Sequence, residues 1–342
     1  MSCSTKPFGT TADGRDVQLI TLTNSNAMTA TVTDLGACLV SAYVPTRTGE
    51  LIDVVLAHAD VQGYENNPMG FGASIGRCAN RIADASFELD GKQVDLAANE
   101  GKNSLHSGPN MWHQRLWDVI ETGDDHVTFG LTSEDGDQGF PGKAEVRATY
   151  TLSENNELTV HYEVTLSERS VVNMTNHVYW NLNGHASGDI LGHQLSIDAD
   201  GYLPTDEGNI PLGEIASVEG TIFDLRNPHR LDTPLAQFPR GYDNNFCLRE
   251  TEGVRPFARL VGDETGIALE ISSDSPGVQV YQAGWLDDMS GKDGAAYGQF
   301  SGIALEAQIW PDAIHHSDWA SPIFGPERPF SQTIVFAFSV EK

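Results

Sequence analysis

The segment NMTNHVYWNLNG, residues 173–184, alternates like a β-strand whose two faces differ in character. Counted by twos, His177 shares a polar face with Thr175, whereas Trp180 shares an apolar face with Val178. The apolar face is suited to a protein core. An imidazole titrates near neutral pH, so His177 is a candidate for moving a proton. A histidine that is hydrogen-bonded for purely structural reasons is the alternative.

A glutamate stands at the centre of the apolar segment GIALEAQIW, residues 302–310. In a strand, Leu305 and Ala307 point to one side while Glu306 and Gln308 point to the other. Charged side chains are rarely buried unless they are paired or functional. Glu306 is therefore a candidate functional residue, and a carboxylate that accepts backbone hydrogen bonds or faces solvent is the alternative.

Four more segments carry polar side chains suited to holding a ligand. GRCANRI offers Asn80 and Arg81, NSLHSG offers His106, GYDNNF offers Asp243 and PGVQVY offers Gln279. Each has a structural alternative, because Gly-Tyr-Asp-Asn is common turn chemistry and arginines often form surface ion pairs.

The neighbouring His315 and His316 resemble a metal-binding pair. Neighbours in an extended chain point to opposite sides, so we do not expect them to bind one ion. The sequence contains no H-E-x-x-H, P-loop or dinucleotide glycine motif. No metal or cofactor is expected.

Composition narrows the classes of partner. The 342 residues carry a net charge of −28, which argues against nucleic acid and anionic membrane surfaces, because both select basic patches. The same charge disfavours phosphorylated substrates. A content of 39% apolar residues with 34 glycines and 16 prolines is typical of a globular protein with many turns.

Four scattered cysteines without metal-type spacing favour a reducing compartment with free thiols. The N-terminal residues contain no apolar signal region, and no run approaches the length of a membrane span. A cytoplasmic location is expected. The oligomeric state, monomer or homodimer, is left open.

Most of the periodicity has a repeat of two, which predicts strands. Residues 144–152 and 158–166 alternate on either side of a turn, and 85–96 forms another hairpin around Asp90-Gly91. Further strands are predicted at 28–33, 37–45, 114–121, 126–132, 193–199, 278–283, 302–309 and 332–340. Helical periodicity is nearly absent, although a short helix fits residues 60–65. The pattern predicts an all-β antiparallel sandwich forming one domain over residues 1–342.

Taken together, these segments resemble the galactose mutarotase (aldose 1-epimerase) family. The matching motifs GRCANRI, NSLHSG, TNHVYWNL, GYDNNF, PGVQVY and LEAQIWPDA follow one another in the family's order between residues 76 and 313. VTDLGACLVSAYVP, which precedes them, is similar to the family's opening strands. The resemblance implies a large galactose mutarotase-like β-sandwich with a sugar site in an open cleft.

The resemblance also implies an activity, the interconversion of the α and β anomers of aldohexoses. Glu306 matches the general base, His177 the general acid, and His106 a histidine that contacts the sugar near the reacting centre. A base takes the proton of the C1 hydroxyl while an acid protonates the ring oxygen. The open-chain aldehyde then rotates about C1–C2 and recloses. One carboxylate and one imidazole suffice for this cycle, without a cofactor.

The remaining matches concern sugar binding. Arg81, Asp243 and Gln279 match positions that hold sugar hydroxyls, and Asn80 is a further expected contact. LHSG stands where LHGG is usual and GYDNN where GYDHN is common, so the preferred aldose, galactose or glucose, is left open. Trp285 is a candidate for stacking on a sugar ring, with core packing as its alternative.

Three alternatives differ in the residues they use. A glycoside hydrolase or lyase on a related sandwich would use Glu306 with Asp243 as a carboxylate pair. A non-catalytic sugar-binding module would keep the cleft and exchange no anomers. A sugar-phosphate epimerase would need a basic cluster, for which only Arg77 and Arg81 are available.

Overall fold

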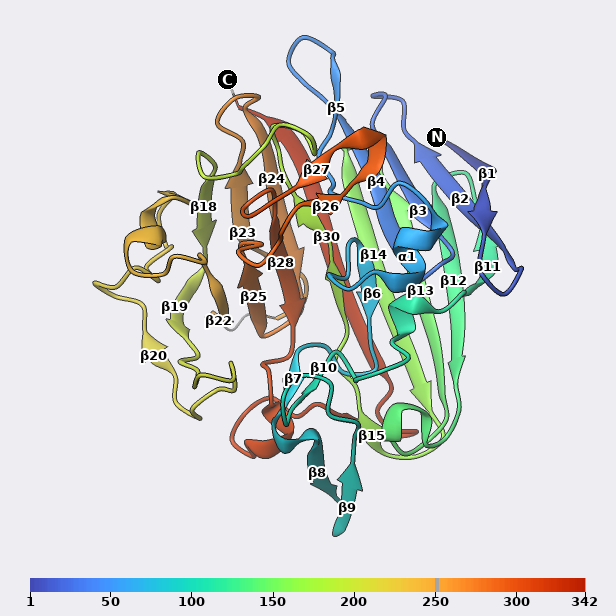
Figure 1. Ribbon diagram of the computed structural model, residues 1–342, viewed down its shortest axis with the longest axis vertical. Coiled ribbons are helices and arrows are strands. Elements are labelled where there is room, and N and C mark those ends of the chain that lie inside the picture. Colours follow the sequence, from blue (N-terminus) through green and yellow to red (C-terminus); the bar gives the residue numbers. More distant parts are fainter. Residues whose placement is uncertain (250–251, 342) are drawn as a thin grey trace.

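The computed structural model describes residues 1–249 and 252–341, whose regular structure is almost all antiparallel strand (Figure 1). The largest sheet has nine strands in the order β11-β12-β13-β14-β30-β24-β23-β18-β21. These strands are β11 (Asp118–Thr122), β12 (His126–Ser133), β13 (Ala144–Leu152), β14 (Glu157–Leu166), β30 (Phe330–Val340), β24 (Ile267–Ser273), β23 (Arg255–Val261), β18 (Gln194–Ile197) and β21 (His229–Arg230).

Two smaller sheets lie against the large one. The six-stranded sheet comprises, in order, β17 (Tyr179–Trp180), β28 (Ile303–Gln308), β25 (Gly277–Tyr281), β22 (Asp243–Leu248), β19 (Ala199–Tyr202) and β20 (Ala216–Ser217). The five-stranded sheet comprises β1 (Ser2–Thr10), β2 (Asp16–Thr23), β3 (Thr29–Thr33), β4 (Cys38–Pro45) and β5 (Leu51–Asp53).

Short strand pairs and turns complete the fold. The pairs are β16 (Thr175–His177) with β6 (Ala73–Ile75), β7 (Arg81–Ile82) with β10 (Ser104–Leu105), β8 (Ser86–Leu89) with β9 (Lys92–Asp95), β15 (Ser170–Val171) with β29 (Ile323–Phe324), and β26 (Met289–Ser290) with β27 (Ala296–Tyr297). The helices are α1 (Val61–Asn66) and the 3₁₀ turns η1 (Ala83–Ala85), η2 (Trp112–Gln114), η3 (Asp137–Gly139), η4 (Thr233–Ala236), η5 (Lys292–Gly294) and η6 (Ala313–His315). None of these helices has the length and apolar character needed to cross a membrane.

One large apolar core joins the three sheets. It takes Val146 and Tyr150 from the nine-stranded sheet, Val32 from the five-stranded sheet and Leu305 from the six-stranded sheet. Trp180 of β17 packs on Phe336 of β30, with ring centroids 5.0 Å apart. The layers therefore form a β-sandwich, as the alternating sequence predicts.

Both predicted hairpins are confirmed. β13 pairs with β14 along its whole length, from Ala144 opposite Leu166 to Leu152 opposite Leu158. β8 and β9 form the second hairpin, which projects at the bottom of Figure 1. Asp90 and Gly91 both have positive φ, 53° and 75°, the conformation that a two-residue turn between twisted strands requires.

Two predicted strands were longer than the observed ones. The strand predicted at 114–121 begins only at Asp118, because Trp117 buries its ring beside Trp112 and donates a 3.0 Å hydrogen bond to its carbonyl oxygen. The run 193–199 divides at Asp198 into β18 and β19, which belong to different sheets. Local alternation cannot reveal such a change of partner.

The segment 173–184 also divides, into β16 and β17, which pair with different strands. Its polar face is as inaccessible to water as its apolar face. Trp180 and Leu182 pack in the main core, as expected for the apolar face. The Asn181 amide, on the polar face, donates to the carbonyl oxygens of Gly188 and Ser301.

The expectation that His315 and His316 lie in extended chain was wrong. They lie at the end of the η6 turn, where both side chains approach Asp312. His315 Nδ1 is 2.7 Å from Asp312 Oδ1, and the His316 ring stacks on Trp319. These contacts give both histidines structural roles.

Candidate active site

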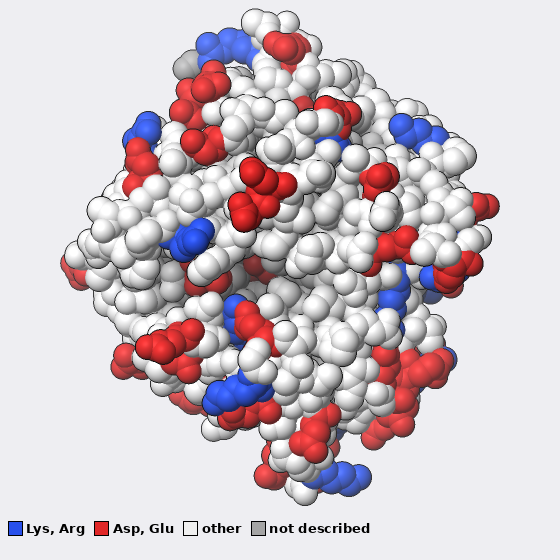
Figure 2. All heavy atoms as spheres, viewed as in Figure 1, with Lys and Arg blue, Asp and Glu red and all other residues white. Residues whose placement is uncertain are grey.

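A cavity of about 400 Å³ opens on the face shown in Figure 2, which is hollowed near its centre. All seven residues singled out from the sequence line it: Asn80, Arg81, His106, His177, Asp243, Gln279 and Glu306. They come from six separate strands and loops, so the fold brings together side chains that are up to 226 positions apart (306 − 80).

Glu306 reaches the cavity because of its place on β28. Ile303, Leu305 and Ala307 pack in the main core, so alternation directs Glu306 to the opposite face. Only 2% of the glutamate is exposed. Opposite it in the sheet lies Gln279 of β25. Among the described residues Glu306 Oε2 has no hydrogen-bond partner, which leaves this oxygen free for a ligand.

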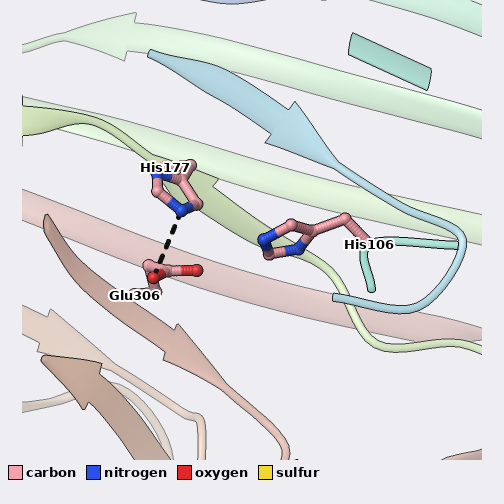
Figure 3. A group of neighbouring side chains, drawn as sticks. All are labelled: His106, His177 and Glu306. Carbon is pink, nitrogen blue, oxygen red and sulfur yellow. Dashed lines mark ion pairs between the residues drawn. The ribbon is translucent and has the colours of Figure 1, made fainter. Parts of the chain in front are cut away.

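His177 faces Glu306 from the end of β16 (Figure 3). Its Nε2 lies 3.4 Å from Glu306 Oε1, and 6% of the residue is exposed. The imidazole packs against the ring of Tyr179, with centroids 5.1 Å apart. The Tyr179 hydroxyl is in turn fixed by a 3.1 Å hydrogen bond to the carbonyl oxygen of Met69. Packing therefore orients the imidazole toward the carboxyl group.

His106 is the third side chain drawn in Figure 3, and its ring lies edge-on to that of His177 with centroids 5.5 Å apart. It occupies a left-handed backbone conformation with φ of 51°. Its Nδ1 accepts a 3.1 Å hydrogen bond from the backbone N–H of Asn80, and the backbone N–H of His106 donates to the Asn80 carbonyl oxygen. Because Nδ1 is an acceptor, the proton of the neutral ring lies on Nε2.

This tautomer bears on metal binding. Nitrogen and oxygen atoms of His106, His177 and Glu306 lie within 4.8 Å of one another, a spacing that a metal ion could use. A histidine that binds a metal through Nε2 carries its proton on Nδ1, which then donates a hydrogen bond. His106 shows the reverse pattern, because Nδ1 accepts one. The geometry favours Nε2 of His106 as a hydrogen-bond donor to a ligand over a metal ligand.

Arg81 enters the cavity from β7 and is held by a bidentate ion pair. Its Nε and Nη2 donate to the two carboxylate oxygens of Glu100 at 2.6 and 2.8 Å. The arginine is buried and Glu100 lies at the cavity wall. The ion pair named as the structural alternative for Arg81 therefore exists, and it fixes a guanidinium group within the cavity rather than on an outer surface.

Asp243 and Gln279 form a second fixed polar group. Gln279 Nε2 donates to Asp243 Oδ1 at 2.7 Å, and Asn209 Nδ2 approaches Asp243 Oδ2 at 3.4 Å. Asp243 of β22 pairs with Tyr281 of β25, and Asn245 of β22 pairs with Gln279 of β25. Paired residues and residues two apart in a strand share a face, so Asp243 and Gln279 lie on the same side of the sheet. Amide and carboxylate groups in this arrangement suit the hydroxyl groups of a polar ligand.

Burial shifts the proton affinities of the facing pair in opposite directions. Burial, with a smaller contribution from the nearby Asp243 charge, raises the pKa of Glu306 to about 8. Burial lowers the pKa of His177 to about 4. Both shifts favour the uncharged form. Between these limits the pair holds one proton, which in the empty cavity lies on the carboxyl group.

Several cavity residues were missed from the sequence. Tyr281 shares the strand face of Gln279, so alternation could have indicated it. His113 is the middle residue of the η2 turn, after Trp112, and burial lowers its pKa to about 3. Asn209 and Glu100 lie in loops. The local sequence around His113, Asn209 and Glu100 does not indicate which segments these residues contact.

Arg77 is not part of the site. Its guanidinium is fully buried and donates to the carbonyl oxygens of Pro141 and Gly142 and to Ser133 Oγ. The basic cluster of Arg77 with Arg81, which a sugar-phosphate epimerase would require, is therefore not formed at the cavity. Trp285 is 62% exposed at the cavity wall, so core packing is excluded for this residue.

Fold and site together define a class: a large β-sandwich whose cavity holds a facing carboxyl and imidazole among groups that bind hydroxyls. The sequence matches the aldose 1-epimerase family over residues 18–337. The galactose mutarotase of Bos taurus is 41% identical to this chain over 320 residues, which cover 92% of each chain. The aldose 1-epimerase of Escherichia coli K12 is 35% identical, and the match covers 96% of this chain and 97% of that protein.

A solved structure gives the same result. The GalM/aldose epimerase homologue of C. elegans superimposes with a TM-score of 0.89 at 29% identity, covering 95% of this chain and 99% of its own. The chain belongs to the aldose 1-epimerase family. The resemblance seen in the motifs is thereby confirmed, and so is the galactose mutarotase-like sandwich.

Proposed function

We propose that the protein is an aldose 1-epimerase, a mutarotase that interconverts the α and β anomers of aldohexoses such as galactose and glucose. The observation that carries the proposal is the 3.4 Å contact between His177 Nε2 and Glu306 Oε1 in the cavity. The names of the relatives, galactose mutarotase and aldose 1-epimerase, support the same activity.

Ring opening and closure of a hemiacetal need two proton transfers at neighbouring oxygens. In the proposed cycle Glu306 takes the proton of the C1 hydroxyl while His177 protonates the ring oxygen. The C1–O5 bond then breaks, and the aldehyde forms. After rotation about C1–C2, the neutral His177 accepts the proton of the C5 hydroxyl as that oxygen attacks C1. Glu306 returns its proton to the former carbonyl oxygen, which restores both groups.

The pair must start this cycle with its single proton on His177. In the empty cavity burial favours the proton on Glu306. A C1 hydroxyl that donates to Glu306 stabilises the carboxylate form, which lowers the pKa of Glu306 when the sugar is bound. Sugar binding therefore draws the proton onto His177, and the reaction begins only when the site is filled.

The other cavity groups would bind and orient the sugar. Nε2–H of His106 would donate to an oxygen near the reacting centre. Arg81, the paired Asp243 and Gln279, and Asn80 would hold the remaining hydroxyls. Fixed donors and acceptors of this kind hold the reacting atoms in position at little cost in entropy.

Asp243 is poorly placed for the hydrolase alternative, in which it would act with Glu306 as a carboxylate pair. Both of its carboxylate oxygens lie within hydrogen-bonding range of amide donors, Gln279 and Asn209. The arrangement therefore favours a binding role for Asp243.

The decisive measurement is the optical rotation of freshly dissolved α-galactose, followed with and without the protein. The wild type should accelerate the approach to equilibrium well beyond the spontaneous rate. Glu306→Gln and His177→Asn should each lower kcat by about 10²–10⁴-fold, because each removes one proton-transfer group. Unchanged circular dichroism would show that the variants fold.

The exposed Glu163→Gln and His229→Asn variants make matched controls, because they change the same residue types outside the cavity. Both should retain full activity. Absence of acceleration for galactose, glucose and other aldoses would rule out the proposal. Release of a second sugar from a disaccharide would establish a hydrolase instead.

We also propose a cytoplasmic location and a neutral monosaccharide as the binding partner. Cys3, Cys38, Cys78 and Cys247 are all free thiols. Three of them are buried, which is typical of a protein made in a reducing compartment. Fractionation of cells that produce the protein would test the location.

A further inference from the structure

Trp285 differs from the other five tryptophans in its exposure. Trp112, Trp117, Trp180 and Trp319 are buried and Trp310 is half-buried. Trp285 is 62% exposed, yet it lies in the wall of the cavity that holds Glu306 and His177. Trp285 does not pack in the core, and a large exposed apolar side chain at a cavity is typical of a ligand-binding site.

The indole is held in place rather than left free. The guanidinium carbon of Arg240 lies 4.4 Å from the ring centroid, which covers one face of the indole. The backbone N–H of Trp285 donates to the Tyr281 hydroxyl at 3.2 Å, and Tyr281 also lines the cavity. The second indole face is therefore available at a fixed orientation.

The backbone at Gly284, next to Trp285, lies directly against Arg240. Arg240 Nη1 donates to the carbonyl oxygen of Gly284 at 2.9 Å. A Cβ atom at position 284 would lie 1.8 Å from the carbonyl oxygen of Arg240, so only glycine permits the two backbones to approach. Arg240 thus fixes both the backbone before Trp285 and its ring.

We infer that Trp285 is a substrate-binding residue whose free indole face stacks on the C–H-rich face of the sugar ring, with Arg240 as the residue that positions it. The inference rests on the proposed function and adds a residue to it. A sugar ring presents C–H groups as well as hydroxyls, and the charged groups around Asp243 and Arg81 serve only the hydroxyls. A preorganised aromatic face supplies the apolar part of recognition.

Steady-state kinetics of mutarotation separate this role from catalysis. Trp285→Ala should raise KM about 5- to 30-fold and leave kcat within about twofold, because stacking is the same in ground and transition states. Trp285→Phe should retain most of the affinity. Ile120→Ala is the matched control, since Ile120 is exposed but lies on β11 outside the cavity.

The role of Arg240 is tested through Trp285. Arg240→Ala should raise KM by less than Trp285→Ala does. The double variant should match Trp285→Ala alone, because Arg240 acts through the indole. Additive effects of the two changes would overturn the positioning role.

Fluorescence reports the same contact without turnover. Acrylamide, a neutral quencher suited to a protein of net charge −28, should quench mainly Trp285. Galactose at anomeric equilibrium should protect the wild type from quenching and leave Trp285→Phe unprotected. Mannitol, an open-chain polyol, should give no protection.

The outcomes separate the two proposals. Anomer exchange by the wild type with an unchanged KM in Trp285→Ala and no protection by galactose would overturn the stacking role and leave the proposed function intact. Protection by galactose without anomer exchange would uphold stacking and overturn the proposed function. Absence of both would overturn both.

Discussion

Nε2 of His177 lies 3.4 Å from Oε1 of Glu306, and neither side chain is more than marginally exposed to water. Burial moves the two pKa values apart, upward for the carboxyl group and downward for the imidazole. The two residues therefore behave as one acid–base unit that holds a single proton across the neutral pH range.

The single-proton state sets the pH dependence of activity. We expect kcat/KM to be level between about pH 4 and about pH 8, the values to which burial shifts the pKa of His177 and of Glu306. Activity should fall below the range because the pair gains a second proton, and above it because the last proton is lost. Rates corrected for spontaneous mutarotation would show this; a fall centred near pH 6.5 would contradict it.

Asp243 should extend the alkaline limit of that range. Its negative charge contributes to the raised pKa of Glu306. Asp243→Asn removes this charge, so the alkaline fall in kcat/KM should move to lower pH. KM should also rise, since an oxygen that binds the ligand becomes an amide. The control is Asp118→Asn, a change at an exposed residue outside the cavity. If the alkaline fall of Asp243→Asn stays at the pH of the wild type, the charge of Asp243 does not influence Glu306 and His177.

Glu306 should make the enzyme less stable at alkaline pH. Its folded-state pKa of about 8 exceeds the ordinary value of 4.5, so the folded state binds more protons between these limits, and stability falls as pH rises through them. Glu306→Gln cannot ionise. The variant should match the wild type below pH 4.5 and exceed it above pH 8, by about 1.4 kcal/mol for each unit of real pKa shift. Urea unfolding at pH 4 and pH 9 would measure the difference, and equal stability at pH 9 would refute it.

A buried ion pair away from the catalytic residues should be important for stability. Lys292 Nζ lies 2.6 Å from Asp53 Oδ2 and donates to the Val40 carbonyl oxygen at 2.7 Å. Lys292→Met would leave Asp53 buried without its partner. We expect a loss of about 3–5 kcal/mol in the free energy of unfolding.

The matched control is the exposed pair of Lys102 and Asp84, whose N–O distance is 2.7 Å. Lys102→Met should cost far less stability than Lys292→Met, because solvent screens an exposed pair. Denaturant midpoints would compare the two variants. Similar losses of stability in the two variants would mean that burial does not determine how much each ion pair stabilises the protein.

Much of the fold and site could be predicted locally. The alternation around Glu306 indicated a strand with a carboxyl group on its non-core face, and Asp90-Gly91 indicated a tight hairpin turn. Strand alternation and turn chemistry depend only on near neighbours in the chain, so the sequence displays them directly. The six motifs, taken in order, indicated the family.

Other features needed the tertiary structure. The division of residues 173–184 between two sheet partners, the Glu100 partner of Arg81 and the exposure of Trp285 all depend on segments far apart in the chain. The tautomer of His106 depends likewise on the N–H of Asn80. The sequence by itself determined which groups could do acid–base chemistry and which strands carry them. Only folding decided which groups meet and how dry their surroundings are, because contact and burial are set by long-range packing, and burial is what shifts the proton affinities of Glu306 and His177.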